Sequence, residues 1–135
     1  MRFMVIVKAD KNSEAGAMPS EKLLTDMAKF NEELAKAGVL LDLSGLQPTS
    51  KGARIEYSGK KRTVTDGPFT EAKEVVAGYW LLETKTKDEA IEWAKRVPFE
   101  EGAVELRQLF ELEDFEPGPA IDRARELGKQ LGIVK

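Results

Sequence analysis

With 135 residues, of which 41% are hydrophobic and 33% charged, the chain has the size and composition of one soluble globular domain. Its net charge of −3 excludes the surplus of Lys and Arg that attracts nucleic acids and anionic membranes, so we expect neither as a partner. The absence of Cys and His excludes disulfides, Ser–His or Cys–His nucleophile pairs and the usual zinc sites. Any general base would have to be a carboxylate, Lys or Tyr, and no cofactor is expected.

The first part of the chain predicts a strand, a helix and a strand. Residues 3–7 are continuously apolar, which is typical of a strand buried on both faces but too short for a signal peptide or a membrane span. We therefore expect a cytoplasmic protein. Residues 9–19 predict a loop, and an apolar stripe at helical spacing then runs from the N-cap Ser20 to Gly38. Residues 39–46 predict a strand in which Leu40, Asp42, Ser44 and Leu46 share one face.

The second part predicts a hairpin followed by a strand, a helix and a strand. Residues 53–57 alternate, Ser58 and Gly59 turn the chain, and residues 63–65 return as a short partner. After a break at residues 66–69 and a polar turn, residues 75–82 read as a central strand. A capping box at Thr86 starts a helix that Pro98 stops, and residues 104–112 predict the last strand. A further helix follows Pro119.

This order is β-α-β, a hairpin insertion and a second β-α-β, which is the split βαβ plan of a ferredoxin-like α+β fold. It gives an antiparallel sheet with both helices on one face. Residues 3–7 and 75–82 are nevertheless apolar on both faces, so the second face must also be covered. We expect a homodimer to cover it, and the alternative is cover by the tail helix. The domain would span residues 1–115, with residues 116–135 as a C-terminal helical extension.

Several stretches carry a resemblance to a known family. The longest is VTDGPFTEAKE at residues 64–74, which runs on through Gly78-Tyr79-Trp80. Shorter ones are AGVLL at 37–41, GLQP at 45–48 and KGAR at 51–54. Over about residues 1–113, the sequence resembles the DGPF branch of the YCII-related proteins.

The resemblance implies a dimeric α+β barrel in which two sheets face each other, and it implies no settled reaction. In the wider YCII group, a His–Asp pair in a pocket has suggested enzyme activity, but this chain has no His. Proteins of the DGPF branch are often associated with extracytoplasmic-function sigma factors, which would suit a regulatory role.

Asp66 is the first candidate for a catalytic residue. Pro68 restricts Gly67 to an extended conformation, the glycine permits close approach of another group, and Phe69 can exclude water. A carboxylate held against an aromatic wall can act as an acid or base. The structural alternative is an Asx turn, in which Asp66 bonds its own backbone and Phe69 anchors the loop in the core.

The other candidates are ligand-binding residues. Asp42 and Ser44 are polar groups on an apolar strand, which suggests a pocket wall or simple exposure near a strand end. Arg54 shares a face with Glu56 and could bind a carboxylate-bearing ligand or form a cross-strand ion pair. Lys73 could pair with Asp66 or lie on the surface.

Tyr79 and Trp80 lie on opposite faces of one strand, so one belongs to the core or a dimer interface and the other could line a cavity. Asp66 and Asp42 are too few carboxylates to predict a metal site.

Three functions follow from these residues. The first, which we favour, is small-molecule binding near residues 66–69, with a regulatory role as one consequence. The second is a cofactor-independent enzyme that transfers protons through Asp66, with Arg54 or Tyr79 orienting a small organic substrate. The third is a structural or adaptor dimer without a pocket.

Overall fold

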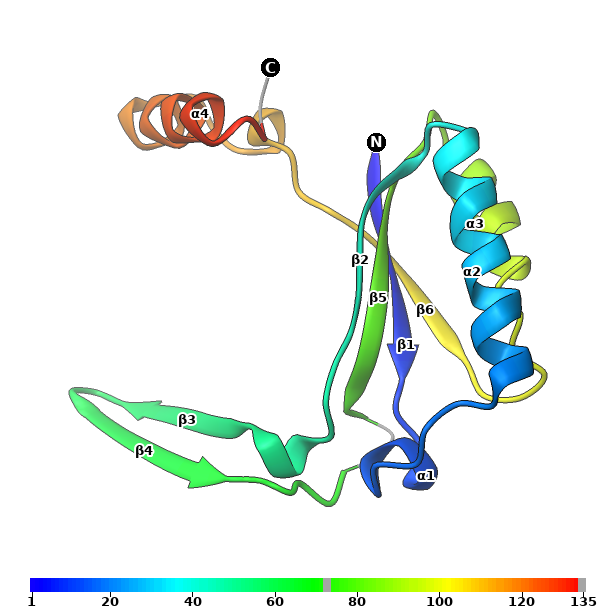
Figure 1. The fold of residues 1–135 in the computed structure, drawn as a ribbon. Coiled ribbons are helices and arrows are strands. Elements are labelled where there is room, and N and C mark those ends of the chain that lie inside the picture. The colour runs from blue at the N-terminus through cyan, green and yellow to red at the C-terminus, as the bar shows by residue number, and fades with distance from the viewer. Residues whose placement is uncertain (72–73, 134–135) are drawn as a thin grey trace.

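The computed structural model describes residues 1–71 and 74–133 (Figure 1). Its strands are β1 (Arg2–Lys8), β2 (Leu40–Gly45), β3 (Ala53–Ser58), β4 (Lys61–Asp66), β5 (Val76–Glu83) and β6 (Val104–Gln108). Its helices are α1 (Lys11–Glu14), α2 (Glu21–Lys36), α3 (Lys87–Lys95) and α4 (Pro119–Leu131), with 3-10 turns η1 (Thr49–Lys51) and η3 (Leu112–Asp114).

Four strands form the main sheet in the order β2-β5-β1-β6, and every neighbouring pair is antiparallel. The helices α2 and α3 cover one face of this sheet (Figure 1). The predicted ferredoxin-like α+β architecture is thus confirmed, with residues 75–82 lying in a central strand. The strands β3 and β4 pair only with each other and form a separate hairpin.

Local signals set the ends of the two covering helices. The Ser20 side chain accepts a hydrogen bond from the Leu23 backbone N–H at the start of α2. Gly38 follows that helix with φ +72°, a conformation that glycine adopts without strain. The Thr86 side chain accepts from the Glu89 N–H at the start of α3, so both predicted N-caps are confirmed. The predicted capping box is only half formed, because the Glu89 carboxylate accepts from the Lys85 N–H rather than from the Thr86 N–H.

The core lies between the helices and the sheet. It is built from Val5, Phe30, Leu34, Val39, Trp80 and Leu82. The Trp80 ring meets the Phe30 ring edge-on, with 5.5 Å between the ring centroids, and its indole N–H donates to Asn31 Oδ1 at 2.7 Å. Trp80 is therefore the core member of the Tyr79–Trp80 pair, and Tyr79 points to the opposite face of the sheet.

The strand β2 contains a β-bulge and therefore departs from the strict alternation that the sequence predicted. Leu40 lies opposite Leu82, whereas Asp42 lies opposite Leu81, because the register shifts between Leu40 and Asp42. Leu40 packs against the core, so it does not share a face with Asp42 and Ser44 as the strict alternation predicted. The extra residue, Leu41, is left largely exposed. The bulge thereby turns Asp42 to the face that carries no helix.

Two further boundaries differ from the sequence prediction. The expected loop at residues 9–19 contains the short helix α1, which the Asp10 side chain caps by accepting from the Ser13 N–H. The strand β6 ends at Gln108, so Phe110 and Leu112 lie beyond it rather than within it. The reason is that the chain turns there, with Leu112 opening the η3 turn.

Two arms project from the sheet on the side away from α2 and α3 (Figure 1). The β3–β4 hairpin leaves one end of the sheet, and α4 with its connecting segment leaves the other. We call the sheet surface between them the open face. Since α4 stands away from the sheet, the alternative in which the tail helix covers the open face of its own chain is wrong. No helix within residues 1–71 and 74–133 has the length and apolar character needed to cross a membrane.

Candidate functional site

The DGPF loop, named for its residues Asp66, Gly67, Pro68 and Phe69, is docked on the η1 turn. The Gly67 N–H donates to the Gly52 carbonyl at 3.0 Å, and the Phe69 N–H donates to Thr49 Oγ1 at 2.9 Å. A Cβ placed on Gly67 would lie 1.8 Å from the Thr49 carbonyl oxygen. The backbone of Thr49 therefore approaches Gly67 too closely for any other residue, as the sequence predicted.

Thr49 is in turn held by Glu14 at the end of α1. The Thr49 N–H donates to Glu14 Oε1 at 3.1 Å, and the Thr49 hydroxyl donates to Glu14 Oε2 at 2.5 Å. Because that hydroxyl also accepts from Phe69, one side chain joins α1, the η1 turn and the DGPF loop. Charge-assisted bonds to a carboxylate are stronger than neutral ones, so this junction fixes the base of the hairpin.

Arg54 and Phe69 lie together beside this junction. The Arg54 guanidinium sits over the Phe69 ring, 4.2 Å from its centroid, and its Nη2 lies 3.4 Å from Glu71 Oε2. Arg54 thus pairs with a carboxylate after the loop rather than with Glu56 on its own strand. The predicted partner Lys73 lies outside the described residues, so its pairing with Asp66 stays a prediction.

Asp66 ends β4, opposite Ala53, and its side chain is exposed to solvent. An Asx turn joins the side-chain oxygen to the N–H two residues on, and Pro68 has no N–H. That alternative is therefore wrong. The loop is tied instead through the backbone of Gly67 and Phe69. Phe69 is half-buried and lies under Arg54 rather than in the core.

A polar pair lies on the open face. The Tyr79 hydroxyl donates to Asp42 Oδ2 at 2.9 Å, and Asp42 Oδ1 accepts from the Leu43 N–H at 2.8 Å. Ser44 lies directly opposite Tyr79 in the β2–β5 register and so points to the same face. The neighbouring apolar residues Met4, Ile6 and Leu81 on this face are half-buried.

The predicted site residues therefore fall into two groups. Asp42, Ser44 and Tyr79 meet on the open face, while Arg54 and Phe69 meet at the base of the hairpin. Sequence reasoning missed Glu14 and Thr49, which no sequence signal joins because their contact depends on the tertiary path of the chain. Within the described residues, no three carboxylates gather in a way that could hold a metal ion.

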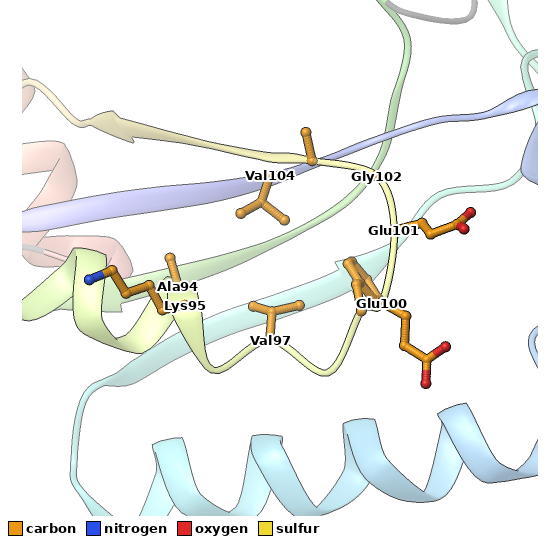
Figure 2. Close-up of a pocket in the computed structure, with 9 residues that line it drawn as sticks. Ala94, Lys95, Val97, Glu100, Glu101, Gly102 and Val104 are labelled. Carbon is orange, nitrogen blue, oxygen red and sulfur yellow. The ribbon is translucent and has the colours of Figure 1, made fainter.

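Figure 2 shows a hollow elsewhere, between the end of α3 and the start of β6. Val97 and Val104 point into it, and the carboxylates of Glu100 and Glu101 point away. Its volume is about 190 Å³, below the roughly 300–1,000 Å³ of ordinary ligand pockets. None of the predicted site residues lines it. It is a surface indentation over the core and contributes nothing to the candidate site.

The sequence of residues 1–113 matches the family model described as the YCII-related domain. The chain belongs to the YCII-related family. It is also similar to an uncharacterised protein of Rhizobium meliloti (strain 1021), with 32% identity over 75 residues. That match covers 56% of this chain and 60% of the relative, so it spans less than two thirds of the relative's length. The C-terminal arm, from Asp114 through α4, lies outside the matched YCII-related domain.

Replacing Gly67 by Ala tests the docking of the DGPF loop. The added Cβ would collide with a backbone carbonyl, which cannot move aside as a flexible side chain can. We expect a loss of about 1–3 kcal/mol in the free energy of unfolding, measured by urea denaturation. Gly52→Ala is the matched control, because its Cβ would make an ordinary 3.6 Å contact with the same Thr49 carbonyl. Equal midpoints for the two variants would contradict the docking.

Replacing Thr49 by Val tests the junction at Glu14. The substitution preserves shape but removes the acceptor for the Phe69 N–H and a donor to Glu14. We expect about 1 kcal/mol lower stability and faster hydrogen exchange at the Phe69 amide. Thr49→Ser retains the hydroxyl and should leave that amide protected. If both variants exchange alike, the hydroxyl does not hold the loop.

Proposed function

We propose that this YCII-related chain forms a homodimer and binds a small organic molecule between the open faces of the two subunits. The observation that carries the proposal is the Tyr79–Asp42 hydrogen bond, set among apolar side chains on a sheet face that its own helices leave bare. Ligand pockets combine such apolar walls with a few fixed polar groups.

The solvent-exposed area of the chain supports the proposed homodimer. A compact monomer of 15.0 kDa exposes about 7,000 Å², whereas this chain exposes 10200 Å². The excess of about 3,000 Å² is more than the roughly 1,000–2,500 Å² that each subunit of an obligate homodimer usually buries, so the exposed surface is large enough for such an interface. Much of it lies on the two arms, which carry exposed apolar residues such as Ile55, Val64 and Leu127.

The distribution of polarity on the open face also supports a dimer. Met4, Ile6 and Leu81 lie on its two central strands. The edge strand β6 places Glu105 opposite Ile6 and Arg107 opposite Met4, and Glu105 lies 3.9 Å from Lys8 Nζ. An apolar centre with a charged rim is the usual anatomy of a protein interface.

In such a dimer, Asp42, Ser44 and Tyr79 would form a polar floor inside an otherwise apolar enclosure. A carboxylate and a phenol that are already paired hold each other in place and offer their remaining hydrogen-bonding positions to a ligand. The docked DGPF loop, with Arg54 and Phe69, supplies a fixed support at the same end of the sheet as Ser44. A regulatory consequence would follow if the ligand binds the dimer more tightly than the separate subunits.

The dimer is tested by sedimentation velocity at low micromolar concentration, where we expect twice the mass of the chain. Ile6→Glu should weaken the dimer at least a hundredfold, because it would bury two unpaired carboxylates at the apolar centre. Ala35→Glu, on the exposed side of α2, is the control and should leave the mass unchanged. Circular dichroism establishes that both variants are folded. A monomeric wild-type chain would sink the proposal.

Ligand binding is tested by thermal-shift screening of a small-molecule library against the dimer. Compounds that stabilise the wild type should bind Tyr79→Phe and Asp42→Asn about three- to tenfold more weakly, since each variant loses one hydrogen-bonding group at the floor. Asp88→Asn, in the exposed first turn of α3, is the matched control for Asp42→Asn.

An Asp66→Asn variant separates binding from the enzyme alternative. Equal stabilisation of it and the wild type would argue against proton transfer through Asp66 and leave binding intact. If every stabilising compound acts equally on the Tyr79, Asp42 and Asp88 variants, the open face does not bind these compounds.

A further inference from the structure

We infer that α4 of one subunit docks on the apolar side of the β3–β4 hairpin of the second copy, so that each subunit clasps the other at both ends of the sheet. This inference rests on the proposed homodimer and deepens it. It assigns a role to the C-terminal arm, which lies outside the matched YCII-related domain.

The segment that leads into the C-terminal arm is anchored on the side of the open face. Arg2 shares a sheet face with Met4 and Ile6, and its guanidinium makes two hydrogen bonds to the Glu111 carboxylate, at 2.8 and 3.0 Å. The hydrogen bonds to Glu111 raise the pKa of Arg2 above its ordinary value. The rings of Phe110 and Phe115 are in contact, with 5.1 Å between their centroids and a tilt of 35° between their planes. The direction of the arm is therefore built into the chain.

One side of α4 is occupied within the chain and another is bare. Arg125 lies 3.8 Å from Glu113 of η3, so the side of α4 that carries Arg125, with the buried Gly128, faces that turn. Ala124, Leu127 and Leu131 follow at spacings of three and four and form a second, exposed stripe. Leu127 and Leu131 are 55% and 63% exposed, which is high for leucines on an amphipathic helix.

The hairpin carries an apolar surface of matching kind. Ile55 and Val64 lie directly opposite each other, so their side chains share one side of the hairpin. Tyr57 is two residues along β3 and points to that side as well. All residues of β3 and β4 are exposed. A lone two-stranded hairpin is at best marginally stable in water, so this one needs a covering layer.

Charge complementarity favours the C-terminal arm of a second copy as the layer that covers the hairpin. The hairpin tip carries Lys60, Lys61 and Arg62, and none of them forms an ion pair within the described residues. Between the sheet and α4, Glu111 pairs with Arg2 and Glu113 lies beside Arg125, whereas Asp114 and Glu116 of the C-terminal arm form no ion pair within the described residues. A basic tip against an acidic segment gives attraction and fixes register, whereas hairpin-to-hairpin contact would oppose like charges.

Geometry excludes this contact within one chain and permits it between two. The hairpin and α4 leave opposite ends of the sheet on the same side (Figure 1). In the proposed dimer, the two-fold axis lies between the two facing sheets and runs perpendicular to their strands. A rotation of 180° about this axis turns the open face of the second copy toward the first and reverses the direction of its strands. The hairpin of one subunit then lies beside α4 of the other, and the contact occurs twice.

The absence of native cysteine permits a direct test by cross-linking. Differently tagged full-length Val64→Cys and Leu127→Cys chains are co-expressed, treated with a short bis-maleimide and separated under denaturing conditions. We expect a covalent dimer that contains one chain of each tag, with the linked peptides identified by mass spectrometry. Ala35→Cys, on the outer side of α2, replaces Val64→Cys in the control and should give no such product.

Sedimentation of the same unlinked samples separates the possible failures. Covalent dimers from Leu127→Cys alone would mean that the helices pair with each other, and dimers from Val64→Cys alone would mean that the hairpins do. Either result overturns the inference. A dimer in sedimentation with no mixed cross-link overturns the clasp and leaves the proposed function standing. A monomer overturns both.

Discussion

One constraint governs the molecule: a four-stranded sheet has two faces, and this chain supplies helices for only one of them. Leaving the central apolar residues of the other face in water forfeits about 25 cal/mol for every Å² that could be buried. The two arms add to that exposure rather than relieving it, since both point past the bare face. The proposed dimer would complete a core of which this chain supplies one half, and both the proposed ligand site and the clasp depend on it.

The candidate site depends on two small departures from regular structure. The bulge in β2 sends Leu40 to the core and Asp42 to the open face, where Asp42 meets Tyr79. The DGPF loop is pressed against the η1 turn closely enough that only glycine fits at its second position. The first departure places a polar group at an apolar surface, and the second fixes the end of the sheet from which the hairpin leaves.

Periodicity and capping predicted the fold because they report local physics. The Ser20 and Thr86 caps and the alternation within residues 53–57 each act over a few residues, and their elements formed as expected. Most of the failed predictions lie where contacts between residues far apart in the sequence determine the structure. Strict alternation missed the β2 bulge, which depends on pairing with β5. Glu14 and Thr49 were missed for the same reason. The Asx-turn alternative failed for a local reason, because Pro68 has no N–H to donate.

The C-terminal arm extends this reasoning from the site to the assembly. An α4 that shielded apolar surface within its own chain would lie on the open face, whereas α4 stands away from the sheet, beyond the segment that the Arg2–Glu111 hydrogen bonds anchor. Holding an amphipathic helix out in solvent is unfavourable for a monomer but pre-organises a helix that docks elsewhere, because its direction is fixed before the partner arrives. The same holds for the hairpin, whose base the Thr49 junction fixes. With two arms anchored at opposite ends of one face, the proposed dimer would place each arm against the other arm of a rotated copy.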